Sequence, residues 1–229
     1  MFGRKKRKAQ ASEEVEEQVE EKPARAAEDP WEALDASRDW RENGPFDISE
    51  VDLDADDVKR LDFGTLIFTP FPEMGMQLQV DQQTNAVQAV LVNHDQSAIE
   101  VSLFAAPAQS DLTRQVRDEM VRSTEQTGGE ATLAEGPFGT EIRRVLPLQD
   151  SDGKRAFHIS RTWFVQGPRW LLRGVLMGQA GMIEGVEGPA EVLYEFFANI
   201  VVRRDDVPHV PGHVIEMEIP EEIGVSQQK

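Results

Sequence analysis

Two long apolar segments lie close together in the second half of the chain, at residues 155–178. They read RAFHISRTWFV and RWLLRGVLMG, and a Gly167-Pro168 pair lies between them. Glycine and proline are typical of tight turns, and apolar segments of this length are typical of buried strands. The pattern therefore predicts a central β-hairpin with Gly167-Pro168 as its two-residue loop.

Alternation divides the side chains of this hairpin between two faces. The first face carries Phe157, Ile159, Arg161, Trp163, Val165, Trp170, Leu172 and Leu176. The second face carries His158, Thr162, Phe164, Leu171, Arg173, Val175 and Met177. Because both faces are largely apolar, we expect both to be covered. This register places Val165 opposite Trp170, and Arg161 opposite Gly174, where a missing side chain leaves room for the guanidinium.

Shorter segments on either side of the hairpin show strand or helix periodicity. Strands are predicted at 61–68, 75–80, 86–92, 98–105, 131–134, 141–148 and 201–202. One helix is predicted at 111–127, capped by Ser110 or Asp111, and a second follows Gly188-Pro189. The sequence thus predicts a single α+β domain, in which a mainly antiparallel sheet of six to eight strands packs against two main helices.

Charge and proline content divide the chain into four parts. Residues 1–43 are predicted to be a disordered charged tail, with a short helix at 30–41 that begins at Asp29-Pro30. Residues 44–60 form an acidic linker that docks on the domain, and residues 61–204 form the α+β domain itself. Residues 205–229 are predicted to be an extended, acidic, proline-containing arm.

Composition narrows the classes of function. The 229 residues carry a formal net charge of -18 and contain no cysteine. The acidic balance argues against broad nucleic-acid binding, and disulfides, zinc–thiolate sites and cysteine nucleophiles are excluded. No apolar run is long enough to span a membrane, and the basic start of the chain is not followed by the apolar part of a secretory signal. We expect a cytoplasmic protein, with peripheral contact to a membrane as an alternative.

Catalytic, cofactor-binding and metal-binding motifs are not found in the sequence. The glycine spacings match neither a dinucleotide fingerprint nor a phosphate-binding loop, and no nucleophile elbow occurs. His209 and His213 are four residues apart, but Pro211 and Gly212 between them exclude a helical pair of metal ligands. We therefore predict no enzyme activity, no cofactor and no metal.

Arg161, Arg173 and His158 are the residues that suggest a ligand site. A buried guanidinium needs a counter-charge, so one interpretation is an anion-binding site that joins these three residues. The other is a structural ion pair for each arginine, with Glu100 and Glu141 as the carboxylates. The positions of the three residues on both faces of the hairpin count against a single pocket.

The amino-terminal tail carries two further candidates. Trp31 and Trp40 lie in a polar segment, where they either dock on the domain or anchor a partner protein. Five consecutive basic residues, Arg4, Lys5, Lys6, Arg7 and Lys8, could attach the chain to an anionic membrane or to nucleic acid. Neighbouring glutamates compete for this basic patch.

Several stretches resemble an uncharacterised actinobacterial family, the domain of unknown function DUF 3710. They are GPFD at 44–47, RLDFGTLIFTP at 60–70, VSLFAAP at 101–107, EGPFGTEIR at 135–143 and GPRWLLRG at 167–174. The resemblance covers residues 44–220 and implies a cytosolic or membrane-peripheral actinobacterial protein, with no activity to carry over. The leading hypothesis is a non-enzymatic interaction or adaptor protein with an unidentified protein partner; the alternatives are binding of a small anionic ligand, an enzyme of unknown reaction, and attachment through the basic patch.

Overall fold

The computed structural model describes residues 29–84, 86–149, 152–205 and 207–220. The helices are α1 (Pro30–Asp35), α2 (Thr113–Gln126), α3 (Gln179–Met182) and α4 (Glu191–Ala198), with 3-10 turns η1 (Ile48–Glu50) and η2 (Gly188–Ala190). The strands are β1 (Phe46–Asp47), β2 (Leu61–Asp62), β3 (Leu66–Phe68), β4 (Gly75–Val80), β5 (Val87–His94), β6 (Ser97–Ala105), β7 (Glu130–Gly136), β8 (Gly139–Gln149), β9 (Arg155–Gly167), β10 (Trp170–Gly178) and β11 (Val201–Val202).

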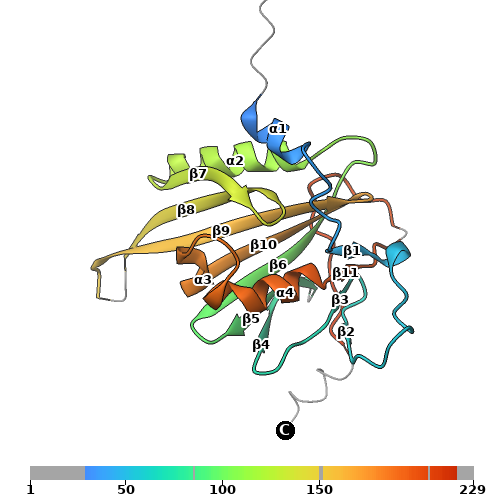
Figure 1. Ribbon diagram of the computed structural model, residues 1–229. Helices are drawn as coiled ribbons and strands as arrows, with labels where there is room; N and C mark the ends of the chain where they lie inside the picture. The colour runs from blue at the N-terminus through green and yellow to red at the C-terminus, as the bar shows by residue number, and fades with distance from the viewer. Residues whose placement is uncertain (1–28, 85, 150–151, 206, 221–229) are drawn as a thin grey trace, which may run out of the picture.

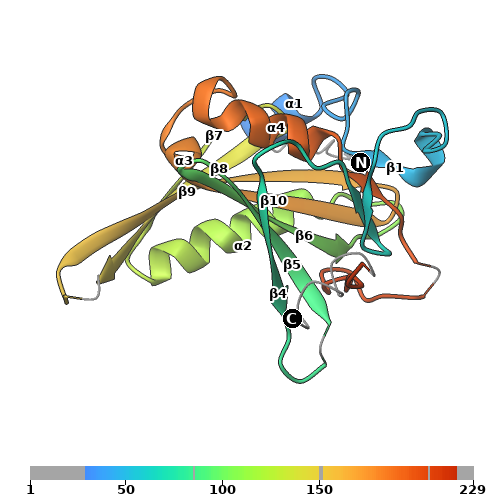
Figure 2. The same ribbon diagram turned by 90° about the horizontal axis from the view of Figure 1, so that it is seen from below.

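Seven strands form one antiparallel sheet in the order β4-β5-β6-β10-β9-β8-β7, with the predicted hairpin β9–β10 near its middle. Four short strands form a second sheet in the order β1-β11-β3-β2. Helix α2 covers part of one face of the large sheet, while α3, α4 and the small sheet lie on the opposite face (Figures 1 and 2). This confirms the predicted fold class.

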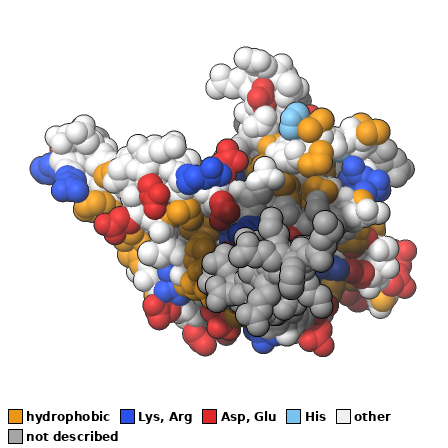
Figure 3. All heavy atoms as spheres, turned by 90° about the horizontal axis from the view of Figure 1, so that it is seen from above, with side chains coloured by type: hydrophobic (Ala, Val, Ile, Leu, Met, Phe, Trp, Pro, Cys, Tyr) orange, Lys and Arg blue, Asp and Glu red, His pale blue; other side chains and the backbone are white. Residues whose placement is uncertain are grey.

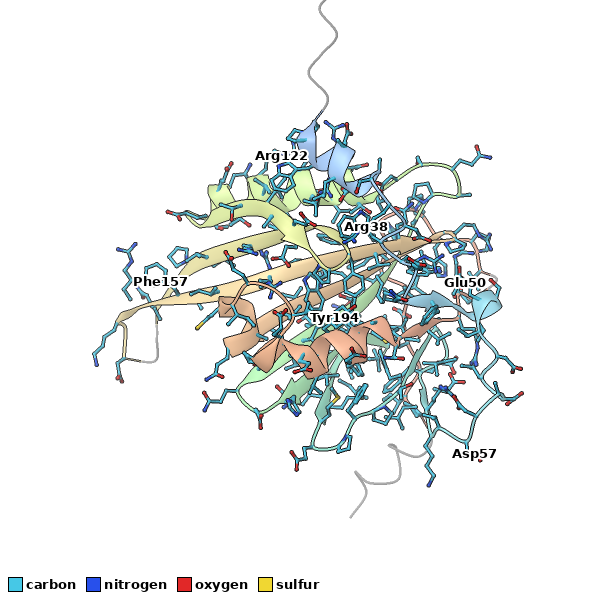
Figure 4. The ribbon with its side chains drawn as sticks, in the orientation of Figure 1. Arg38, Glu50, Asp57, Arg122, Phe157 and Tyr194 are labelled. Atoms are coloured by element: carbon cyan, nitrogen blue, oxygen red, sulfur yellow. The ribbon has the colours of Figure 1, made fainter. Side chains whose placement is uncertain are left out.

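The main core lies between the first face of the large sheet, α4 and the small sheet. Fully buried residues from all three meet there, among them Phe68, Trp163 and Phe197. Phe138 joins them from the β7–β8 turn, with its ring centroid 5.5 Å from that of Trp163 and 5.2 Å from that of Phe197. Tyr194 of α4 closes this aromatic cluster (Figure 4). Aromatic burial on this scale dominates the hydrophobic contribution to stability.

The register of the central hairpin differs from the prediction. Trp170 lies opposite Gly167 and Leu172 opposite Val165, so Pro168 and Arg169 are the loop residues. Arg169 adopts a left-handed conformation with φ of 61°. The register differs because the Trp170 ring lies over position 167. A Cβ placed on Gly167 would stand 2.1 Å from that ring. Glycine at 167 therefore lets the strands pair as far as Trp170.

The predicted division of the side chains between the two faces is confirmed. The observed register differs from the predicted one by two residues, and an even shift leaves every side chain on the same face. Trp163, Val165, Leu172 and Leu176 belong to the main core, whereas Phe164 and Leu171 pack under α2. Gly174 now faces Trp163, and Arg161 faces Leu176, contrary to the prediction. The space at Gly174 is used by Phe197 of α4, which comes within 2.6 Å of a Cβ placed there.

Phe157 was predicted on the core face but is 52 % exposed. The hairpin of β8 and β9 extends beyond the rest of the molecule at this point, so no element covers the side chain (Figure 4). The predicted strand at 61–68 is also interrupted. Phe63 to Thr65 form a tight turn, with Gly64 at φ of 77°, that separates β2 from β3.

The carboxy-terminal segment becomes part of the sheet. Backbone hydrogen bonds join residues 213–215 to the end of β6, and Met217 to Val87 at the start of β5. The side chains of Ile215 and Met217 are buried in the main core. This segment therefore fills the fork where β5 and β6 diverge.

The amino-terminal segment docks on the body. Asp29 caps α1 as predicted, but α1 ends at Asp35, so the predicted helix at 30–41 is too long. In the predicted linker, Phe46 and Asp47 of β1 pair in parallel with β11, and Asp47 accepts a 2.9 Å hydrogen bond from Trp170 Nε1. Residues 1–28 of the predicted tail lie outside the described residues.

Candidate anion-binding site

Arg161 lies on the first face of the sheet in a neutralised, fully buried network. Its Nη2 and Nε donate to the carboxylate of Glu141, at 2.9 Å and 3.1 Å, and its Nη1 donates to the carbonyl of Gly185 at 2.7 Å. Trp163 Nε1 donates to the same carboxylate at 2.8 Å. Arg161 and Glu141 are each 1 % exposed. A buried ion pair with its hydrogen bonds satisfied is a structural element, so this arginine follows the ion-pair interpretation.

The structure does not bring the three predicted site residues together. Arg173 and His158 lie on the second face, on the opposite side of the sheet from Arg161. The predicted site of Arg161, Arg173 and His158 is therefore wrong as a single pocket, because adjacent positions on a strand point to opposite faces. Arg173 has Glu100 as its carboxylate, as the ion-pair interpretation expected.

Arg173 is held in the middle of the second face. Its Nη2 donates to Glu100 at 3.1 Å and to Ser102 Oγ at 2.9 Å, and its guanidinium carbon lies 5.1 Å from the Phe104 ring centroid. The second oxygen of Glu100 accepts from Gln79 at 2.7 Å. The buried Nε of Arg173 has no hydrogen-bond partner among the described residues. This guanidinium therefore keeps donor capacity that the protein does not use.

Arg144 of β8 adds a second cation to this face. It lies opposite Ser160, which is fully buried, and Thr162 is the next residue of β9 on the same face. Within the described part of the chain, Arg144 donates no hydrogen bond and its Nε is buried. The hydroxyls of Ser160 and Thr162 are buried and unpaired there as well. Buried polar groups are nearly always hydrogen-bonded, so a group of three without partners points to an external one.

The electrostatics of the two arginines agree with this geometry. Burial lowers the pKa of Arg144 below its ordinary value, and the positive charge of Arg173 lowers it further, against the opposing effect of Glu100. Burial likewise lowers the pKa of Arg173, again opposed by Glu100. Glu100 pairs with Arg173 alone, so an added anion near Arg144 would offset a positive charge that has no paired carboxylate among the described residues.

A cavity of about 360 Å³ adjoins Arg173 on the same face. Its floor is Phe104 and Leu171, one wall is the first half of α2, and the opposite wall is the segment Pro211–His213. Its lining also includes the charged side chain of Glu119 and the polar side chains of Gln115 and His213. Of the two arginines, Arg173 lines this cavity and Arg144 does not.

Trp31 and Trp40 are both half-buried against the body. Trp31 O accepts from Thr140 Oγ1 at 3.4 Å, and Trp40 Nε1 donates to Leu34 O at 3.1 Å. Arg38 stacks on the Trp40 ring, 3.7 Å from its centroid (Figure 4). The Trp40 ring also lies 3.6 Å from where a Cβ on Gly139 would stand, whereas Trp31 contacts Thr140 through its backbone carbonyl.

Arg117 of α2 is buried, although arginine on a helix surface is usually exposed. It is 2 % exposed, and its Nη1 is bonded to Asp35 of α1. Arg114, one turn earlier, pairs with Glu32 of α1. Acidic and basic side chains both occur on the visible part of this side of the molecule (Figure 3). Two ion pairs therefore join α1 to α2.

The basic patch Arg4–Lys8 lies outside the described residues, so its attachment to a membrane or nucleic acid stays a prediction. No helix in the described part of the chain is both long and apolar enough to cross a bilayer. The described residues also contain no group of three His, Asp or Glu side chains arranged to hold a metal ion.

The fold and the site define an α+β domain with an open, arginine-bearing sheet face. The family model described as "Protein of unknown function (DUF3710)" matches residues 44–226, so the chain belongs to that family. No curated protein matches the chain.

Two solved structures match part of the chain. A crystal structure from Bacteroides thetaiotaomicron VPI-5482 is 12 % identical, with 65 % of this chain and 48 % of that chain covered and a TM-score of 0.36. The present chain thus spans about half the length of that protein. The solution structure of PsbP (CyanoP) from Synechocystis sp. PCC 6803 is 8 % identical, with 63 % and 92 % covered and a TM-score of 0.36.

Proposed function

We propose that this chain is a non-catalytic binding protein that recognises an anionic group at Arg144 and Arg173. The observation that carries the proposal is the imbalance on the second face, where Glu100 pairs with Arg173 and Arg144 has no carboxylate partner among the described residues. The buried Nε of Arg144 has no hydrogen-bond partner within the described chain, so this donor is available to a ligand. Guanidiniums bind carboxylates and phosphates in a two-point geometry, which suits this role.

The adaptor hypothesis draws less support from the structure. It was motivated by Trp31 and Trp40 as partner anchors, but the Trp40 ring lies beside Gly139 and bonds to Leu34, and the Trp31 carbonyl accepts from Thr140. An interaction role at the second face remains compatible with the proposal, provided that the partner presents the anionic group. Among the described residues we identify no constellation of nucleophile, base and orienting group beside the arginines, so the proposal contains no reaction step.

Isothermal titration calorimetry tests the proposal with inorganic phosphate and sodium butyrate at low ionic strength. Each charge-assisted hydrogen bond contributes about 1.5–3 kcal/mol, so Arg144→Gln should weaken anion binding roughly tenfold or more. Arg122→Gln is the matched control, because Arg122 lies on the exposed side of α2 and bonds only to its own helix (Figure 4). Equal affinity in the wild type and Arg144→Gln, or no heat with either anion, would contradict the proposal.

A further inference from the structure

The cavity under α2 is lined by charged as well as apolar side chains, and both elements that form it contribute one of each. From the α2 side it is lined by Leu112 and by Glu119, which lies about 10 Å further along the helix axis. From β10 it is lined by Leu171 and Arg173, which are two residues apart and therefore on the same face of the strand. The arrangement of these four side chains decides what the cavity can bind.

Helix α2 and strand β10 run in the same direction past the cavity. At the start of the helix, the Leu112 amide donates to the side chain of Gln166, which lies opposite Leu171 in the sheet. Just beyond the end of the helix, Gly129 lies against Leu146 in the far part of β8. Strand β10 leads toward that same part of the sheet, because it pairs antiparallel with β9, as β8 does. The two charged residues therefore lie at one end of the cavity and the two leucines at the other.

The other lining residues add apolar surface and a polar rim. Phe104 lies opposite Leu171 in the floor, and Val116 lies on α2 between the two ends. Gln115 and His213 are exposed, so they lie at the opening of the cavity rather than in its depth. At about 360 Å³, the cavity is near the small end of the range for ligand sites, roughly 300–1,000 Å³. It therefore suits a small ligand with one charged and one apolar end.

The charged end offers a hydrogen-bond donor and a carboxylate that the protein does not use. Arg173 bonds to Glu100 and Ser102 through Nη2, and its Nη1 donates no hydrogen bond within the described residues. Glu119 is exposed, and its carboxylate forms no ion pair or hydrogen bond with any described residue. A ligand with a carboxylate alone would add negative charge beside Glu100 and Glu119, whereas a ligand with an ammonium group alone would leave Nη1 without an acceptor. A ligand that carries both groups close together satisfies both side chains.

We infer that the cavity under α2 binds a free α-amino acid with an apolar side chain. The carboxylate of this ligand lies at Arg173, its ammonium group at Glu119, and its side chain between Leu112 and Leu171. The inference goes beyond the proposed function, because Arg144 does not line the cavity and the recognised group is a zwitterion rather than an anion alone. The two sites share only Arg173.

The test is isothermal titration calorimetry on the full chain at low ionic strength. The probes are L-leucine, leucinamide, which lacks the carboxylate, 4-methylpentanoate, which lacks the amino group, and glycine, which lacks the apolar side chain. Leucine should bind most tightly. Leucinamide and 4-methylpentanoate should each bind at least about fivefold more weakly, because each loses one charge-assisted contact. Glycine should bind at least about tenfold more weakly, since it buries no apolar side chain.

Glu119→Gln locates the ammonium group of the ligand. This substitution should lower the affinity for leucine about three- to fivefold, and it should remove the advantage of leucine over 4-methylpentanoate, because that advantage depends on the Glu119 carboxylate. Glu125→Gln is the matched control, since Glu125 is exposed on the same helix and does not line the cavity. Arg144→Gln should leave the affinity for leucine within about twofold of the wild type, because Arg144 lies outside the cavity.

The outcomes separate this inference from the proposed function. Absence of heat with leucine, or equal affinity for leucine, leucinamide and 4-methylpentanoate, would overturn the inference, and phosphate binding that depends on Arg144 would then leave the proposed function intact. Leucine binding that is unchanged in Glu119→Gln would overturn the inference as well. Leucine binding that depends on Glu119, together with no binding of phosphate or butyrate, would support the inference and overturn the proposed function.

Discussion

On the first face of the large sheet, Arg161 donates hydrogen bonds to Glu141 and Gly185, whereas on the second face Arg144 donates none within the described chain. The first face is covered by α4 and the small sheet, and part of the second face is covered only by α2 (Figures 1 and 2). The two faces therefore differ in whether the arginine is neutralised by a carboxylate and in how far the face is covered by other elements. A buried arginine bonded to a buried carboxylate, as Arg161 is to the Glu141 carboxylate that it shares with Arg143, holds a fold together. A partly buried arginine with no carboxylate partner marks a surface for an external anion.

The largest expected effect comes from breaking the first-face pair. Glu141→Gln should lower the free energy of unfolding by about 3–5 kcal/mol, because Arg161 would keep its charge in a dry environment without a counter-charge. Urea denaturation at pH 7 measures the loss. Glu184→Gln is the control, since Glu184 is an exposed partner of Arg143 and should change stability by less than about 1 kcal/mol. A similar small effect of both substitutions would contradict the structural role of the pair.

The next effect concerns the docking of α1. Asp35 accepts from Arg117 and, at 2.8 Å, from Thr140 N, so Asp35→Asn removes the only carboxylate that Arg117 contacts within the described residues. We expect a loss of about 1–3 kcal/mol and faster proteolysis between α1 and β1. Limited trypsin digestion and urea denaturation provide the measurements. Glu32→Gln removes the exposed pair with Arg114 and should have a smaller effect; an equal effect would contradict the assigned role of Arg117.

A third prediction uses the pH dependence of stability on the first face. Burial alone would raise the pKa of Asp47, but hydrogen bonds from Ser49 and Trp170 outweigh it and hold the pKa below its ordinary value. The folded state therefore binds this proton less tightly than the unfolded state does. The stabilisation is complete above the unfolded pKa, about 4, and is lost as the pH falls through the lower folded pKa.

Asp47→Asn should flatten the part of the stability curve that falls below pH 4, and it should lower stability at pH 7. Thermal unfolding followed between pH 2.5 and 7, in roughly half-unit steps, measures this effect. Asp57→Asn is a suitable control, because Asp57 is exposed on the acidic linker (Figure 4). A curve for Asp47→Asn that runs parallel to that of the wild type would show that the Trp170 contact adds no pH-dependent stability.

Much of the fold follows from alternation in the sequence. The parity of residues 157–177 separates the core face from the second face correctly, and that separation survives the two-residue change in register. The register itself depends on how the Trp170 ring lies across Gly167, which is a packing property rather than a pattern. The insertion of the carboxy-terminal segment between β5 and β6 could not be predicted from a sequence pattern either. It depends on a fork between the two strands that forms only in the folded sheet.

The candidate site was predicted only in part. Arg173, His158 and the partner Glu100 could be placed from the sequence, because all lie on recognisable strands. Arg144 was missed, although it shares its face with Arg173 once β8 is aligned with β9 across the Asp152-Gly153 turn. The burial of Arg117 could not be deduced from α2 alone, since its carboxylate comes from a helix 82 residues away in sequence.

The free energy of unfolding of Arg144→Gln, measured in urea without added ligand, tests the contrast between the two faces most directly. If Arg144 serves a ligand, its removal relieves repulsion from Arg173 and a buried unpaired Nε, so stability should be unchanged or higher by up to about 1 kcal/mol. If Arg144 instead serves the fold, as Arg161 does, the variant should lose about 2 kcal/mol or more. That loss would contradict the assignment of the second face as a binding surface.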